Sequence, residues 1–91
     1  MPSPEWSAKA LGDLLGILEY IAEANPDAAQ ALRDEILRKV GCLEDQPKLY
    51  RPGRVAGTRE MVVRSNYILI YRESPEQVTV LRLLHAAQMW P

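Results

Sequence analysis

The sequence predicts an α+β fold in which an N-terminal antiparallel helical hairpin packs on a small antiparallel β-sheet, in the order β-α-α-β-β-β. Apolar residues recur at spacings of three and four over the first half of the chain, which is the period of an amphipathic helix. From residue 59 onward, β-branched and aromatic runs alternate with short polar turns, which is typical of a strand meander. A chain of 91 residues has room for one core, so we expect a single domain over residues 1–91.

The first half of the chain predicts two helices joined by a tight turn. Ser7 is a favourable N-cap for the first helix, and Asn25-Pro26 ends that helix and opens the second, over about residues 26–45. A junction this short makes the two helices antiparallel. Ile17 and Tyr20 flank the apolar stripe of the first helix, so the stripe is wider than one neighbouring helix needs.

The second half predicts strands near residues 59–63, 67–73 and 78–84, and residues 3–6 are a candidate edge strand. In the middle strand, Ile68 and Ile70 point opposite to Tyr67, Leu69 and Tyr71, so both faces of the sheet are apolar. Likewise, we expect Leu81 and Leu83 to point opposite to Val80 and Leu84. Two helices cover only one face, so we expect the other face to be an exposed apolar patch or the seat of a partner.

The net charge of −1 hides an asymmetry between the two halves. Residues 1–46 carry four bases and nine acids, whereas residues 47–91 carry seven bases and three acids. The basic half invites an anionic partner, either nucleic acid or an acidic protein segment, although arginines also solvate exposed sheets. With Cys42 the only cysteine and His85 the only histidine, we expect no disulfide, no metal site and no cofactor. The sequence lacks a signal-peptide or membrane-span pattern, so we expect a cytoplasmic protein without a membrane partner.

One set of side chains would be able to support chemistry if the sheet gathers them on one surface. Arginines stabilise a pentacovalent phosphate, a histidine transfers a proton and a tyrosine stacks on a base, which together would cleave RNA. The alternative is structural: a histidine at a strand end hydrogen-bonds at a sheet corner, and strand tyrosines pack across strands. The residues of this set are Arg59, Arg64, Tyr67, Tyr71, Arg82 and His85.

Four motifs in this order resemble the RelE/ParE superfamily, the toxins of bacterial type II toxin–antitoxin modules. They are RPGR and GTRE before the predicted hairpin, the strand YILIYR, and the closing LHAAQMWP. The similarity covers nearly the whole chain. It implies a compact α/β fold with a helical hairpin on an antiparallel sheet. It also implies a cognate antitoxin whose C-terminal segment wraps the toxin in a hetero-oligomer.

The superfamily divides by activity, and the resemblance implies one of two targets. RelE-like members cleave mRNA on the ribosome, whereas ParE-like members poison DNA gyrase. On the nuclease alternative, the catalytic residues would be Arg59, Arg64, Arg82 and His85. However, His85 is followed by Ala86-Ala87 rather than by the aromatic residue expected in histidine-using nucleases, and the net charge is low for a protein that binds ribosomal RNA. These departures favour the ParE-like branch.

The prediction is therefore a ParE-like toxin that binds gyrase, uses no catalytic residue, recognises no nucleic acid sequence by itself and is neutralised by a ParD-like antitoxin. A degenerate toxin, retained only as an antitoxin partner, is a third possibility. The candidates for gyrase contact are Arg51, Arg54, Arg59 and Trp90, and Trp90 is alternatively a plug that seals the core. The candidates for antitoxin contact are Ile17, Tyr20, Tyr67, Leu69, Tyr71 and Arg82.

Overall fold

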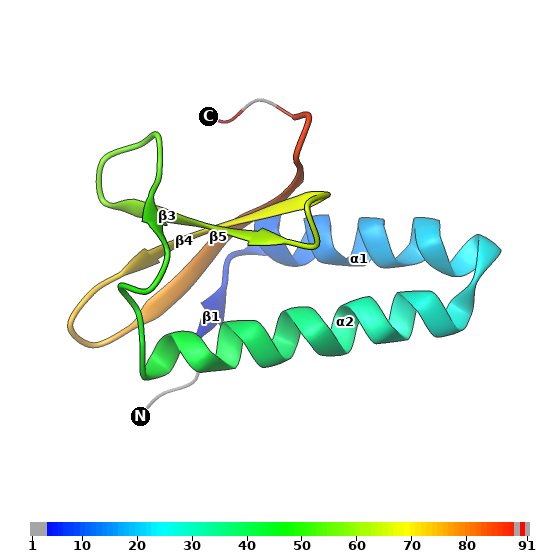
Figure 1. Cartoon of the computed structure of the whole chain (residues 1–91), viewed down its shortest axis with the longest axis horizontal. Helices are drawn as coiled ribbons and strands as arrows, with labels where there is room; N and C mark the ends of the chain where they lie inside the picture. The colour runs from blue at the N-terminus through cyan, green and yellow to red at the C-terminus, as the bar shows by residue number, and fades with distance from the viewer. Residues whose placement is uncertain (1–3, 89, 91) are drawn as a thin grey trace.

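The computed structural model describes residues 4–88 and 90, which form one helical layer packed on one sheet. The elements follow in the order β1 (Glu5–Trp6), α1 (Ala8–Ala24), α2 (Pro26–Gly41), a 3₁₀ turn (Cys42–Glu44), β2 (Arg51–Pro52), β3 (Thr58–Val63), β4 (Tyr67–Glu73) and β5 (Val78–His85). Figure 1 shows α2 on one side of the sheet and the C-terminal tail on the other. The hairpin of α1 and α2 extends past the end of the strands (Figure 1).

The expected caps set the helix boundaries. Ser7 Oγ accepts a hydrogen bond from the Ala10 amide at 3.1 Å, and Asn25 Oδ1 accepts one from the Ala28 amide at 3.0 Å. Pro26 occupies the first turn of α2, where its missing N–H costs nothing. The second helix ends earlier than expected, at Gly41, and continues as the 3₁₀ turn. Across the described residues, neither α1 nor α2 has the length and apolar content of a membrane span.

The sheet is mixed rather than purely antiparallel. The strands lie in the order β1-β5-β4-β3-β2, and β1 pairs parallel to β5 while the other neighbours are antiparallel. Short turns force β3, β4 and β5 into an antiparallel meander, whereas β1 reaches the sheet through the long helical connection and is free of that constraint. The two-residue β2 was not predicted, because it lies in a Pro- and Gly-rich loop.

A bulge changes the direction of the side chains along β5. Ile70 pairs with Arg82, but the next residue, Tyr71, pairs with Val80, so β5 has one extra residue at Leu81. Val80 and Leu83 therefore share the helix-facing side, and the expected opposition between them is wrong. Strict two-residue alternation cannot reveal such an insertion.

The core lies between the helical hairpin and one face of the sheet. The largest side chains in it are essentially inaccessible to solvent, and they come from both layers: Leu32, Ile36, Leu43, Met61, Leu69, Tyr71 and Leu83. Burying this apolar surface is the dominant stabilising term of a domain this small. The core also fixes which sheet face is left for other contacts, which we call the outer face.

Candidate functional site

The basic loop between β2 and β3 is held around one buried carboxylate. Glu60 Oε1 accepts hydrogen bonds from Arg51 Nε at 3.2 Å and Nη2 at 3.1 Å, and Oε2 accepts one from the Arg54 amide at 3.4 Å. Gly53 donates its N–H to Thr58 O at 2.7 Å, and the Thr58 hydroxyl occupies the space that a Cβ on Gly53 would need. The loop backbone is therefore fixed, and it presents the exposed side chain of Arg54 at this corner of the sheet.

Arg59 does not join this basic corner. It lies on the helix-facing side opposite Tyr71, and its Nη1 donates to Tyr50 O at 2.9 Å. The Tyr71 hydroxyl donates to Pro47 O at 2.7 Å, and burial raises the pKa of this phenol. Arg59 and Tyr71 thus hold the segment between the 3₁₀ turn and β2, so both have a structural role in the free chain.

The outer face of the sheet is covered by the C-terminal tail. Trp90 is half-buried and lines one small cavity together with Arg54 and the outer-face residues Ile68, Ile70 and Leu84. Ile70 and Leu84 are only 1% and 4% exposed, although no helix covers them. The expectation of a large exposed apolar patch is therefore wrong for the centre of this face, because Trp90 lies over it. The alternative, a partner bound on this face, stays a prediction. Trp90 and Arg54 become neighbours at its rim.

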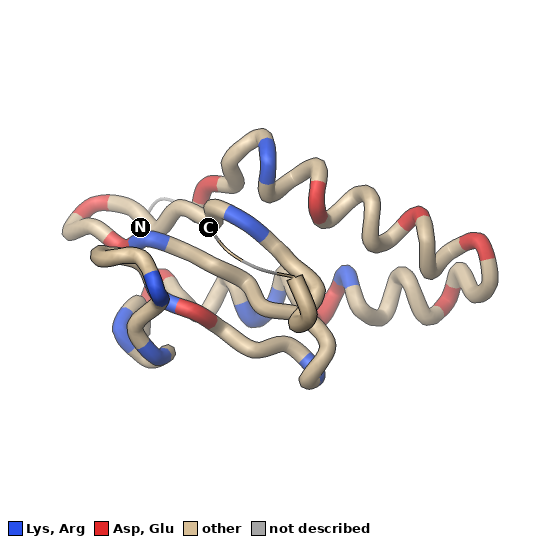
Figure 2. The backbone as a smooth tube through the Cα atoms, turned by 90° about the horizontal axis from the view of Figure 1, so that it is seen from above, with Lys and Arg blue, Asp and Glu red and all other residues tan. Residues whose placement is uncertain are grey.

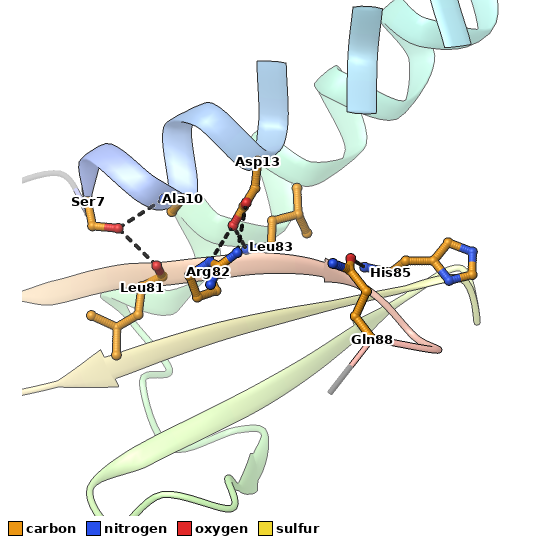
Figure 3. A network of polar contacts seen from close by, with 8 residues as sticks. All are labelled: Ser7, Ala10, Asp13, Leu81, Arg82, Leu83, His85 and Gln88. Atoms are coloured by element: carbon orange, nitrogen blue, oxygen red, sulfur yellow. Dashed lines mark hydrogen bonds and ion pairs between the residues drawn. The ribbon is translucent and has the colours of Figure 1, made fainter. Parts of the chain in front are cut away.

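A compact turn sends the tail back across the sheet. Gln88 Oε1 accepts from the His85 amide at 2.7 Å, and His85 Nδ1 accepts from the Ala87 amide at 3.2 Å. The Ala86 amide donates to Asn66 O at 2.6 Å, which ties the turn to the β3–β4 connection. Figure 3 shows Gln88 reaching back to the His85 backbone while the imidazole points away from α1. The His85 ring packs edge-on against Tyr67, with centroids 5.9 Å apart.

The set of residues considered for RNA cleavage is dispersed over the molecule. Arg59 and His85 lie beside Tyr71 and Tyr67 respectively, four residues apart along β4. Arg64 Nε donates to Glu35 Oε1 on α2 at 2.9 Å, which anchors the β3–β4 turn to the helical layer. His85 lies at the end of β5, where its ring accepts a hydrogen bond from the Ala87 amide.

The last member of that set, Arg82, is engaged by α1. Its Nε and Nη2 donate to the two carboxylate oxygens of Asp13 at 2.8 and 3.1 Å, and the Leu83 amide donates to Asp13 Oδ2 at 3.0 Å (Figure 3). Burial alone would raise the pKa of Asp13, but the hydrogen bonds and charge of Arg82 and the Leu83 amide outweigh it, so the pKa is lowered. Arg82 therefore locks α1 to β5 and is not a free surface cation.

A second surface lies on the helical hairpin. Leu11 and Leu15 of α1 are 47% and 53% exposed, and Tyr20 is 78% exposed. Leu15 lines an open apolar groove of about 270 Å³ between α1 and α2, with Glu19 and Arg33 at its rim. Figure 2 shows acidic residues gathering toward the tip of this hairpin. The sequence pattern predicts a wide apolar stripe on this helix, and Leu11 and Leu15 are exposed members of that stripe.

The predicted antitoxin contacts are split by the fold. Ile17 and Tyr20 lie on α1, with Tyr20 at the surface, whereas Leu69 and Tyr71 are fully buried in the core. Tyr67 is half-buried and packs on the core. Leu69 and Tyr71 thus leave the set of surface candidates, because the helices cover the sheet face on which these residues lie.

The comparisons with known proteins match this chain to one toxin family model and to two proteins named as toxins. The family model described as the ParE toxin of the type II toxin–antitoxin system parDE matches residues 5–90. A Sinorhizobium fredii protein named as toxin Y4kP is 40% identical, over 94% of this chain and 90% of its own length. Toxin RelE2 of Caulobacter vibrioides is 32% identical, over 92% of this chain and 94% of its own.

A solved structure supports the same assignment at the level of the fold. A chain of the chromosomal ParDE toxin–antitoxin system from P. aeruginosa superposes with a TM-score of 0.79 and 25% identity, over 93% of this chain and 96% of that one. The α+β fold and the RelE/ParE resemblance expected from the sequence are thereby confirmed. The chain belongs to the ParE toxin family of type II toxin–antitoxin systems.

Proposed function

We propose that this ParE-family toxin inhibits DNA gyrase by direct protein binding in the cytoplasm, and that a cognate ParD-like antitoxin neutralises it. The observation that carries the proposal is the dispersal of the candidate nuclease residues. A general acid or base and the groups that stabilise a phosphate must reach the same few ångströms around the reacting bond. Along the strand direction, four residues separate Arg59 on β3 from His85 on β5, which is about 13 Å at about 3.3 Å per residue.

The remaining cations support the same reading. Arg64 and Arg82 each have a carboxylate partner, and Arg82 donates in a bidentate fashion. Recruiting Arg82 to a phosphate would leave the half-buried Asp13 without its partner, which is costly. A toxin with this geometry acts by binding rather than by catalysis.

The gyrase contact is proposed to lie at the rim of the outer face, where Arg54 and Trp90 meet. Tryptophan and arginine are the residue types that most often dominate binding energy at protein interfaces. Arg54 is set on anchored backbone, which lowers the entropy lost on binding. Arg51 lies beside them but is engaged with Glu60, so it contributes charge more than contact.

The antitoxin is proposed to occupy the helical hairpin. Exposed leucines beside an apolar groove make a surface that an amphipathic segment fills with its apolar side chains. Glu19 and Arg33 at the groove rim offer one charge of each sign for orienting that segment. The toxin would then exist in its module as a hetero-oligomer with the antitoxin.

The deciding experiment compares two targets with one protein preparation. Purified toxin is added to a DNA gyrase supercoiling and cleavage assay and, in parallel, to a reconstituted translation reaction. Loss of supercoiling or accumulation of cleaved DNA, with intact mRNA, is the expected result. Truncated mRNA with gyrase unaffected would refute gyrase as the target and support the ribosome-dependent nuclease alternative.

Removing the proposed gyrase contacts is expected to weaken inhibition. Trp90→Ala and Arg54→Ala should each raise the toxin concentration needed for half-inhibition by about tenfold, which corresponds to the loss of one interface hot-spot side chain. Arg38→Ala is the matched control, because Arg38 is an exposed arginine on α2 and not on the outer face. Equal loss of inhibition in Arg54→Ala and Arg38→Ala would point to net charge rather than to this contact site.

Charging the groove is expected to weaken antitoxin binding. Leu15→Glu should raise the dissociation constant of the toxin–antitoxin complex at least about tenfold, since it places a carboxylate against an apolar surface. Leu37→Glu is the control, because Leu37 is an exposed leucine on α2 that does not line the groove. Isothermal titration calorimetry would measure the affinity of each toxin variant for the antitoxin. If Leu15→Glu binds the antitoxin as tightly as Leu37→Glu does, the groove is excluded as the antitoxin site.

A further inference from the structure

His85 ends β5 and begins the turn that leads into the C-terminal tail. The turn over residues 85–88 contains two side-chain acceptors, Gln88 Oε1 for the His85 amide and His85 Nδ1 for the Ala87 amide. The Gln88 amide closes the turn by donating to His85 O at 2.9 Å. His85 is therefore bonded through its amide, its carbonyl and its ring, which is a dense set of contacts for an exposed residue.

Whether the His85 ring can accept the hydrogen bond from the Ala87 amide depends on which ring nitrogen carries a proton. A ring nitrogen accepts a hydrogen bond only when it carries no proton, so acceptance at Nδ1 requires the neutral tautomer protonated at Nε2. The ring is kept in place by its edge-on contact with Tyr67, which is itself packed on the core. The acceptor is thus pre-positioned by β4 rather than by the tail.

The turn leads the chain to Trp90, which lies against the sheet. Beyond the turn, Trp90 meets the sheet at the cavity that Ile68, Ile70 and Leu84 line. Gln88 lines the same cavity. A change in the turn would therefore swing Trp90 away from Arg54 while leaving the core intact.

We infer that His85 is a positioning residue, which fixes the reversal of the tail and thereby holds Trp90 over the outer face beside Arg54. This role rests on the proposed function only in its consequence, because Trp90 there becomes part of the gyrase contact. The claim that His85 positions the tail rests on the hydrogen bonds of the turn and does not depend on the target. It also gives the only histidine of the chain a role without acid–base chemistry.

Two substitutions of His85 separate the effect of its hydrogen-bond acceptor from the effect of its aromatic ring. His85→Phe keeps an aromatic ring against Tyr67 but removes the acceptor for the Ala87 amide. His85→Asn removes the ring but restores an acceptor, because an asparagine side chain commonly bonds the backbone N–H two residues further along. A packing role predicts that the phenylalanine variant is the milder one, and a positioning role predicts the opposite order.

The first measurement is ¹⁹F NMR on the full chain labelled with fluorotryptophan. The chain has two tryptophans, so Trp6 serves as an internal control for the core, and Trp90→Phe assigns the second resonance. In His85→Phe the Trp90 resonance is expected to move toward the position of solvent-exposed fluorotryptophan, with Trp6 unchanged. In His85→Asn it is expected to stay near the wild-type position.

The second measurement is gyrase inhibition by the same variants. His85→Phe should raise the half-inhibiting concentration roughly three- to tenfold, the range for losing one hydrogen bond, and His85→Asn should restore it to within about twofold. If the resonances behave as expected but even the wild type leaves gyrase active, the proposed target is wrong and the positioning role stands. If Trp90 moves equally in both variants, or in neither, the positioning role is overturned.

Discussion

Leu69→Ala is expected to destabilise the folded chain by about 2–5 kcal/mol, the usual range for truncating a buried leucine to alanine. Leu69 is fully inaccessible on β4, between Met61 of β3 and Leu83 of β5. Truncation leaves a cavity that the paired strands cannot close by moving, because their register is fixed by hydrogen bonds on both sides. A domain of this length has roughly 5–14 kcal/mol of stability, so the loss is a large fraction of the total.

The measurement is urea unfolding monitored by circular dichroism. Val62→Ala is the matched control, since Val62 lies on β3 and is 44% exposed, and its truncation should change the free energy of unfolding by less than about 0.5 kcal/mol. Comparing Leu69→Ala with Val62→Ala also tests whether Leu69 is a core residue or an antitoxin-contact residue. A variant of unchanged stability with weakened antitoxin binding would restore Leu69 as a contact residue and contradict its burial.

The parts of the fold that local chemistry determines could be predicted. Ser7 and Asn25 mark helix starts by hydrogen bonds within three residues, and Arg64-Ser65 form a turn with positive φ values of 56° and 73° between two apolar strands. Signals of this kind are contained in a short window of sequence. The element order and the helical hairpin followed from them.

The parts that depend on contacts between distant segments could not be predicted. Which sheet face meets the helices is decided by packing, so the sequence pattern does not show that the antitoxin-contact candidates Leu69 and Tyr71 are buried while Leu11 and Leu15 are exposed. Nothing in the local pattern of β5 indicates the bulge at Leu81, which sets the faces of Val80 and Leu83. The covering of the outer face by Trp90 depends on a turn whose two acceptors, from His85 and Gln88, have no strong sequence signature.

The pairing of Asp13 with Arg82 shows how such a distant contact becomes a stability determinant. Asp13→Ala is expected to cost about 2–4 kcal/mol at pH 7, because it leaves the half-buried guanidinium and the Leu83 amide without their acceptor. The two partners are 69 residues apart in sequence, so the contact closes α1 onto β5 across nearly the whole chain. Urea unfolding at pH 7 would measure the loss.

Two further variants identify which part of the Asp13 contact matters. Asp13→Asn keeps a neutral acceptor for the Leu83 amide and should lose about half as much stability as Asp13→Ala. Asp34→Ala removes a carboxylate whose ion pair with Arg33 is solvent-exposed, with a side chain 61% accessible, and should cost less than about 0.5 kcal/mol. Equal losses in the two Asp13 variants would assign the whole effect to the charge on the carboxylate.

The acid dependence gives an independent test of the same contact. The pKa of Asp13 is lowered in the folded chain, so its carboxylate contributes stability that is fully present above the ordinary aspartate value of about 3.9 and is lost as the pH falls through the folded value. The gap in unfolding free energy between wild type and Asp13→Ala should therefore be constant from pH 7 to pH 5 and narrow below pH 4. A gap that stays constant into that acid range would mean that the charge of the carboxylate adds nothing, and that Asp13 stabilises the contact through hydrogen bonds that its neutral form also makes.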